Sequence, residues 1–79
     1  MRDWLQNLRK NKGLTQKEIG EKLGISESYY CSIEKGVRQK KMDMMVASGL
    51  SAVFGIPVSE IVQMEHEYSE AVQTSEEAG

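Results

Sequence analysis

Residues 16–36, QKEIGEKLGISESYYCSIEKG, contain two short amphipathic segments that are separated by only two residues. The segments span residues 15–23 and 26–35, and Gly24 lies between them. Glycine readily adopts the positive φ that a sharp corner between helices requires. Two helices joined by so short a corner cross steeply rather than lying antiparallel. The stretch therefore predicts a helix-turn-helix.

The ends of these segments have the residues that start and stop helices. Thr15 and Glu18 have the spacing of a capping box, and Ser26 is suited to cap the second helix. Gly36 is suited to end it. Gly20 occupies the position where the helices would approach most closely, so a side chain larger than methyl would push them apart. The apolar positions expected to join the helices to each other and to a core are Ile19, Leu23, Ile25, Tyr30 and Ile33.

With these features, residues 11–36, NKGLTQKEIGEKLGISESYYCSIEKG, resemble the Cro-type, lambda-repressor-like helix-turn-helix family, often called the XRE family. The resemblance is close over residues 5–36, looser over residues 37–62 and absent beyond them. It implies an all-α fold, a five-helix lambda-repressor-like DNA-binding domain with a central helix-turn-helix. The alternative interpretation is a generic helical hairpin.

Three further helices are expected around this centre. Asp3 and Gln6 have the spacing of a capping box at the start of the first helix. Asp43 would cap a fourth helix, and Pro57 suits the first turn of a fifth. Gly49, inside the fourth helix, indicates close packing against a neighbour. The side chains expected on the apolar sides of these helices are Trp4, Leu5, Leu8, Val46, Ala47, Leu50, Val53, Phe54, Val58, Ile61 and Val62, with Met42, Met44 and Met45 filling the core and its edge. Met64 and Tyr68 are open candidates for the apolar side of the fifth helix.

Size and composition predict a single domain with a polar end. Residues 1–68 are long enough for one small core. Residues 69–79, SEAVQTSEEAG, are mainly small, polar or acidic, and we expect a frayed or disordered tail there. The connector at residues 37–41, VRQKK, looks longer than in the family and lacks the proline common there. Its path is not predicted.

The formal net charge of −2 is unevenly distributed along the chain. All ten lysines and arginines fall within residues 1–41, which contain five acids and so have a net charge of +5. Residues 42–79 contain seven acids and no lysine or arginine. The first half therefore suits a polyanion such as nucleic acid, and the second half would repel it.

The sequence gives little support to an enzyme, a metalloprotein or a membrane protein. Cys31 is the only cysteine and His66 the only histidine, so the sequence offers no nucleophile pair and no metal-ligand spacing. We expect no catalytic residue, metal or cofactor. A lone cysteine fits a reducing compartment, and no apolar run of membrane-spanning length or secretory signal is evident. The expected location is the bacterial cytoplasm or nucleoid, without membrane contact.

The second helix of such a pair lies in the DNA major groove with its N-terminal residues facing base edges. The resemblance places Glu27, Ser28 and Ser32 at base-contacting positions, and Tyr29 within reach of a base or the backbone. Glu27 has two interpretations: it can accept a hydrogen bond from cytosine N4, or it only stabilises the positive end of its helix. Because both serines are short, specificity would then depend on Tyr29, bound water or DNA shape.

Contacts to phosphates and one internal ion pair are also implied. Gln16 falls at the phosphate-clamping position of the family, at the start of the first helix of the pair. The other phosphate candidates are Lys17, Lys35, Arg38, Lys40 and Lys41, each of which taken alone also suits a solvated surface. Arg9 and Glu34 match the ion pair by which the family joins its first helix to the recognition helix.

The leading functional hypothesis is a sequence-specific, double-stranded DNA-binding transcriptional regulator, a repressor of a phage or mobile-element type. One recognition helix gives limited specificity, so a homodimer on a two-fold operator is expected. The apolar edge of residues 57–68 is the expected dimer surface. The alternative hypothesis is an antitoxin-like or adaptor protein-interaction module, in which the acidic C-terminal half binds a protein partner.

Overall fold

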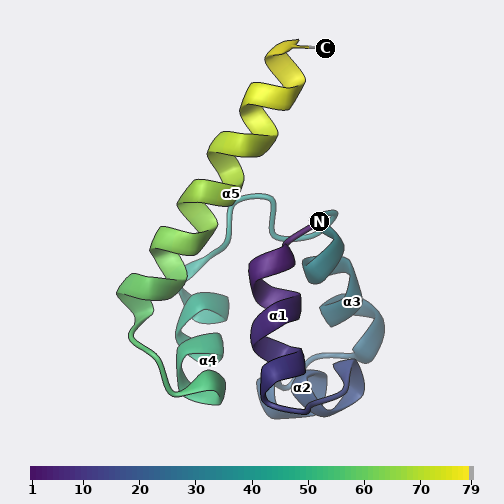
Figure 1. Cartoon of the computed structure of the whole chain (residues 1–79). Coiled ribbons are helices and arrows are strands. Elements are labelled where there is room, and N and C mark those ends of the chain that lie inside the picture. The colour runs from purple at the N-terminus through teal and green to yellow at the C-terminus, as the bar shows by residue number, and fades with distance from the viewer. Residues whose placement is uncertain (79) are drawn as a thin grey trace.

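The computed structural model describes the backbone of residues 1–78 and the side chains of residues 1–71. Its elements are α1 (Asp3–Asn11), α2 (Gln16–Leu23), α3 (Glu27–Lys35), α4 (Met44–Phe54) and α5 (Val58–Ala78), in the order shown in Figure 1. Residues 1–78 contain no strand, and the expected all-α, five-helix fold is confirmed.

The corner between α2 and α3 forms as the sequence predicts. Thr15 and Glu18 make a reciprocal capping box at the start of α2, and Gly24 ends the helix with φ 74°. A Cβ atom built on Gly20 would lie 3.0 Å from the carbonyl oxygen of Ile25 and 3.3 Å from that of Ser26. Even a methyl group would therefore crowd the backbone of the corner, a closer approach than the sequence suggested.

One apolar core joins all five helices. In the described part of the chain its buried members are Leu5, Ile19, Tyr30, Ile33, Ala47, Leu50, Phe54 and Ile61. α2 packs on α3 and on α4, α4 packs on α5, and α1 packs on α3. Gly49 lets α4 approach α2 so closely that a Cβ there would overlap the Leu23 side chain. The core thus fixes the corner against α4.

Helix α5 is the longest element and extends past the rest of the molecule toward the C-terminus (Figure 1). Its backbone is helical through Ala78, so helix does not give way to tail at residue 68 as the sequence analysis expected. Ser69 is partly buried, Glu70 and Ala71 are exposed, and the side chains of residues 72–79 lie outside the described residues. The independence of residues 69–79 from the domain stays a prediction.

No single helix in the described part is both long and apolar enough to cross a membrane. Helices α4 and α5 reach the necessary length and composition only together, and the chain bends by 118° between them.

Two local expectations were wrong. Asp3 does not cap α1: the N-cap position is Arg2, which makes no side-chain cap, and Asp3 is the first helical residue. The side chains of Met44 and Met45 do not fill the core, because they are 66% and 84% exposed at the first turn of α4. Of the three methionines, only Met42 packs against the core.

Candidate nucleic-acid interface

The outward face of α3 and the start of α2 together form an open groove. Its lining side chains are Gln16, Glu27, Ser28, Cys31, Ser32 and Lys35. Three of the four predicted base-contacting residues therefore lie together with two of the predicted phosphate contacts. The groove is polar, and Glu27, Ser28 and Lys35 are exposed along it. Such a surface can donate and accept hydrogen bonds along the edge of a duplex.

The α3 side chains differ in how free their polar atoms are. The Ser32 hydroxyl donates to the Ser28 carbonyl over 3.0 Å, one turn back along the helix. Ser26 caps the helix by accepting from the Tyr29 N–H over 3.0 Å. Tyr30 points the other way and is fully buried, as expected for a core position. Burial raises the pKa of its hydroxyl far above the ordinary value, so Tyr30 stays neutral.

Behind the groove, Glu34 joins the first three helices. Arg9 Nε on α1 lies 2.6 Å from Glu34 Oε2, and the Arg9 guanidinium also donates to the Leu14 carbonyl. Gln16 Nε2 on α2 donates to Glu34 Oε1 over 3.1 Å. The ion pair that the resemblance implied is therefore present. The implied phosphate clamp, Gln16, is in this structure also bonded to that pair.

The environment of Glu34 keeps it ionised. Burial by itself would raise its pKa, since the side chain is only 2% exposed. The hydrogen bonds from Arg9 and Gln16 outweigh this, and the pKa of Glu34 lies below its ordinary value. A charged Glu34 holds Arg9, and with it α1, in a fixed orientation against the recognition helix.

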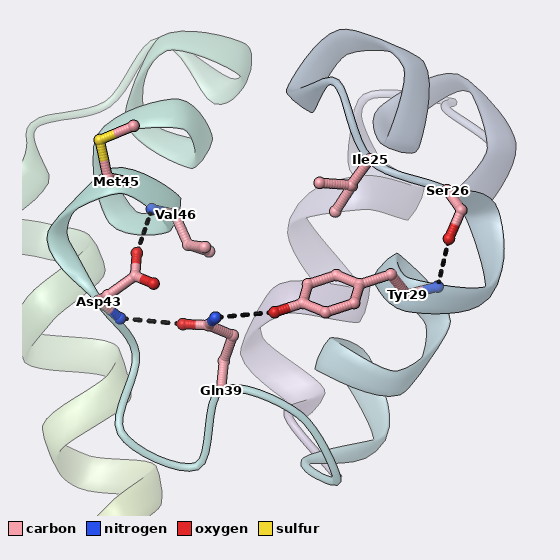
Figure 2. A pocket seen from close by; sticks show the side chains of 7 residues that line it. All are labelled: Ile25, Ser26, Tyr29, Gln39, Asp43, Met45 and Val46. Atoms are coloured by element: carbon pink, nitrogen blue, oxygen red, sulfur yellow. Dashed lines mark hydrogen bonds between the residues drawn. The ribbon is translucent and has the colours of Figure 1, made fainter.

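Tyr29 lies apart from the polar groove, at a second depression between α3 and α4. This depression is lined by Ile25, Ser26, Tyr29, Gln39, Asp43, Met45 and Val46 (Figure 2). Gln39 Nε2 donates to the Tyr29 hydroxyl over 2.9 Å, and the Asp43 N–H donates to Gln39 Oε1 over 3.0 Å. Asp43 in turn caps α4 by accepting from the Val46 N–H. A continuous chain of hydrogen bonds thus connects α3 to the start of α4.

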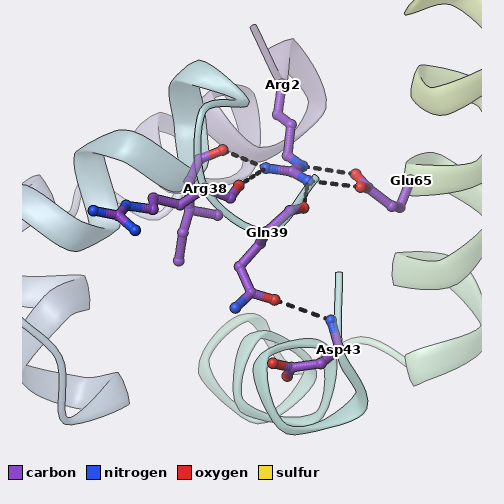
Figure 3. Close-up of polar contacts among 6 residues, drawn as sticks. Arg2, Arg38, Gln39, Asp43 and Glu65 are labelled. Atoms are coloured by element: carbon purple, nitrogen blue, oxygen red, sulfur yellow. Dashed lines mark hydrogen bonds and ion pairs between the residues drawn. The ribbon is translucent and has the colours of Figure 1, made fainter. Parts of the chain in front are cut away.

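The connector after α3 is held by a side chain from the other end of the chain. Arg2 is fully buried, and its guanidinium makes a two-pronged ion pair with Glu65 on α5, both N–O distances being 2.8 Å (Figure 3). The same guanidinium donates to the backbone carbonyls of Ile33, Arg38 and Gln39. It also lies 5.3 Å from the ring centre of Tyr68. We call Arg2, Glu65 and the three carbonyls the Arg2 clamp.

The clamp explains the path of the connector, which the sequence left open. Gln39 has φ 57° and is the only non-glycine residue with positive φ among the described residues. For a residue with a side chain, this left-handed conformation costs roughly 1 kcal/mol. The hydrogen bond from Arg2 to the Gln39 carbonyl and the two bonds of the Gln39 side chain compensate for that cost.

The remaining predicted phosphate contacts lie outside the polar groove. Lys17 is exposed near the start of α2, and Lys40 and Lys41 are exposed on the connector. Arg38 is also exposed, and its guanidinium lies 5.9 Å from the ring centre of Tyr29. Positive charge therefore extends from the start of α2, past Lys35 at the end of α3, to the connector.

Sequence reasoning missed the roles of Arg2, Gln39 and Glu65, and it considered Tyr68 only for the apolar side of the fifth helix, not as a neighbour of Arg2. One signal was present: Glu65 and Tyr68 continue the helical spacing of Val58 and Ile61 along the buried side of α5. A charged residue at such a position requires a buried partner. Nothing in the sequence identifies Arg2 as that partner, because a basic residue near the N-terminus usually lies in solvent. Gln39 gave no signal, since glutamine is not typical of positive φ.

The described residues contain no group of three or more histidine, cysteine, aspartate or glutamate side chains placed to hold a metal ion.

Comparisons with known proteins agree with the geometry. The profile of the helix-turn-helix family matches residues 5–61. The cryptic phage CTXphi transcriptional repressor RstR of Vibrio cholerae is 28% identical over 58 residues, which are 73% of this chain and 50% of that protein. The uncharacterized HTH-type transcriptional regulator YqaF of Bacillus subtilis (strain 168) is 44% identical over 39 residues, 49% of this chain and 51% of that protein.

The chain thus spans about half the length of the curated relatives that it matches. No solved structure gives a significant match.

Proposed function

The chain belongs to the helix-turn-helix family, with lambda-repressor-like architecture, and we propose that it is a sequence-specific regulator of transcription that binds double-stranded DNA. The observation that supports this most directly is the polar groove, where α3 presents Glu27, Ser28 and Ser32 beside Gln16 and Lys35. In helix-turn-helix proteins this face enters the major groove. Members of such regulator families are not typically enzymes.

Within this proposal the contacts divide into two kinds. Glu27, Ser28, Ser32 and Tyr29 contact base edges. The side chains that contact phosphates are Gln16, Lys17, Lys35, Arg38, Lys40 and Lys41. Base contacts specify a sequence, and phosphate contacts fix position and account for most of the salt dependence.

We further propose repression as the outcome of binding. One relative is named a phage transcriptional repressor, and a small domain that occupies an operator blocks polymerase without needing an activating surface. Such a regulator acts where the DNA lies, in the bacterial cytoplasm.

The proposed binding unit is a homodimer on a two-fold operator. Its surface is the outer side of α5 next to the start of α4, where Val62 is 50% exposed and Met44 is 66% exposed over a small apolar depression. Exposed apolar side chains in such a group are typical of subunit contacts. Sedimentation of the wild type and of Val62→Glu tests this: the variant should be monomeric at concentrations where the wild type is dimeric.

Selection of bound duplexes from a random DNA pool tests the function itself. The expected result is an enriched motif with two-fold symmetry. Failure to enrich any motif would contradict the proposal and favour the interaction module, in which the acidic residues of α5 bind a protein.

Salt titrations on the selected operator separate the two kinds of contact. Each phosphate contact should contribute a slope of roughly −0.9 to log affinity against log salt. Replacing Lys40 and Lys41 by alanine should weaken binding to all sequences alike and make the slope shallower. Ser32→Ala should lower the preference for the operator and leave the slope nearly intact. Gln63→Ala, at an exposed glutamine of α5, is the control that should change neither.

A further inference from the structure

We infer that Gln39 is a positioning residue for Tyr29: it makes the tyrosine hydroxyl a hydrogen-bond donor toward an acceptor on DNA. The connector between α3 and α4 is then part of the reading surface, together with α3. This inference rests on the proposed function.

The direction of each hydrogen bond follows from the backbone. The Asp43 N–H can only donate, so the Gln39 atom 3.0 Å from it must be the amide oxygen. The amide nitrogen therefore faces Tyr29, and it can only donate to the hydroxyl oxygen, 2.9 Å away. With its oxygen accepting from Gln39, the Tyr29 hydroxyl keeps its own proton for another partner.

Contacts also fix the position of Gln39, in addition to the orientation of its side-chain amide. Its carbonyl accepts from the buried Arg2 guanidinium, and its backbone has the left-handed conformation. Its side-chain amide is held at both ends, by Tyr29 and by the start of α4 (Figure 2). Neither the glutamine nor the tyrosine can therefore turn without breaking contacts on another element.

Tyr29 is the side chain on α3 best placed to use such a proton. It lies one turn from Ser32, on the half-buried edge of the helix, and borders the open depression between α3 and α4. The Ser32 hydroxyl already donates to the Ser28 carbonyl. Guanine O6, purine N7 and thymine O4 are acceptors in the major groove, and phosphate oxygens are acceptors along the backbone. All of these atoms can accept a hydrogen bond from the Tyr29 hydroxyl.

The test is a double-mutant cycle between Gln39→Glu and Tyr29→Phe. Glutamate has the same shape as glutamine, and its carboxylate still accepts from the Asp43 N–H. The carboxylate cannot donate to Tyr29, so it accepts a hydrogen bond from the tyrosine hydroxyl instead. The hydroxyl then has no hydrogen left to donate to DNA. Binding to the selected operator and to unrelated duplex is measured for the wild type, both single variants and the double variant, with Val37→Glu, at an exposed position of the same connector, as the control for added charge.

Tyr29→Phe should lower affinity roughly fivefold, as expected for one hydrogen bond. If the acceptor is a base, the loss is confined to the operator; if it is a phosphate oxygen, the loss is equal on both duplexes. In either case Gln39→Glu should reproduce the loss in the wild-type background. In the Tyr29→Phe background it should add only the effect seen with the charge control. Additive losses, or no loss from Gln39→Glu beyond that control, would overturn the inference.

A measurement without DNA separates positioning from instability. In protein labelled with ¹³C on its tyrosine rings, Gln39→Ala should move the Tyr29 ring signals and leave those of the buried Tyr30 unchanged. Unmoved Tyr29 signals would also overturn the inference. If the wild type binds no duplex with higher affinity than unrelated DNA, the proposed function itself is wrong. This outcome is seen before any variant is made, so it is distinguishable from a failure of the inference.

Discussion

Two arginine–glutamate pairs, each with one buried and one partly buried partner, hold this small domain together, and they act on different surroundings. Arg9 and Glu34 lie beside Tyr30 and Ile33, in a region where caps and apolar packing already fix three helices. Arg2 and Glu65 lie beside the connector, residues 37–41, which contributes no fully buried side chain. The first pair adjusts an orientation that the core has set. The second replaces a core that the connector lacks.

The largest expected effect comes from removing each arginine in turn. Arg2→Met should cost roughly 3–5 kcal/mol, because it leaves the Glu65 charge and three carbonyls without their donor. Arg9→Met should fall at the low end of that range, because Glu34 keeps the Gln16 donor. Urea unfolding of both variants measures the two costs. Equal costs would mean that the clamp does not replace a core.

The double variant Arg2→Met with Glu65→Leu sharpens this result. Removing both charges should recover much of the loss caused by Arg2→Met alone, because no unpaired carboxylate remains buried.

A second prediction concerns the side of the molecule that packing fixes. Gly20→Leu should destabilise the domain by roughly 1–3 kcal/mol or more, because its side chain would meet the backbone of Ile25 and Ser26. Ala52→Leu, at an exposed position of α4, is the matched control and should change little. Thermal unfolding compares the two. A harmless leucine at position 20 would mean that close approach of α2 to α3 does not hold the corner.

A smaller effect is expected from pH at the first pair. The folded-state pKa of Glu34 is lowered, because its bonds to Arg9 and Gln16 outweigh burial. Its stabilising contribution is therefore fully present above the ordinary value of 4.5 and is lost as pH falls through the lower folded-state pKa. The stability of the wild type relative to Glu34→Gln should shrink over that acidic window. A difference that stays constant with pH would contradict the assignment of this charge.

The smallest effect is expected at the C-terminus. Removing residues 69–79 should leave the thermal midpoint almost unchanged, whereas removing residues 68–79 should cost about 1 kcal/mol through the loss of the Tyr68 ring beside Arg2. The Tyr68 hydroxyl also packs against Gly36, where a Cβ would overlap it. A large loss from the shorter deletion would show that the last residues pack on the domain or on a second subunit.

The sequence predicted most of what is local. Thr15, Ser26 and Asp43 cap the helices for which they were predicted, because a cap and the N–H that it receives lie within three residues of each other. Gly24 and Gly36 end helices for a reason that is equally local. The apolar positions of the corner follow helical spacing, so it was also predictable that they would be buried in the core or packed against it.

What the sequence could not predict depends on distant polar partners. Arg2 looked like one more basic residue of the N-terminal half, and only the fold brings it to Glu65. Gln39 takes a left-handed conformation because Arg2, Tyr29 and Asp43 hold it there. The candidate site divides in the same way: the polar groove follows from the predictable corner of α2 and α3, whereas the position of the Tyr29 hydroxyl requires the connector.

The Arg2 clamp also has a consequence for the order in which the domain folds. Its two charged partners are 63 residues apart in the chain, whereas the contacts of the α2–α3 corner are nearly all local. Closing so long a loop costs entropy before the ion pair can compensate, so the corner is expected in the transition state and the clamp only after it. Arg2→Met should then leave the refolding rate nearly unchanged and accelerate unfolding. The clamp would slow unfolding and so set the lifetime of the folded DNA-reading surface.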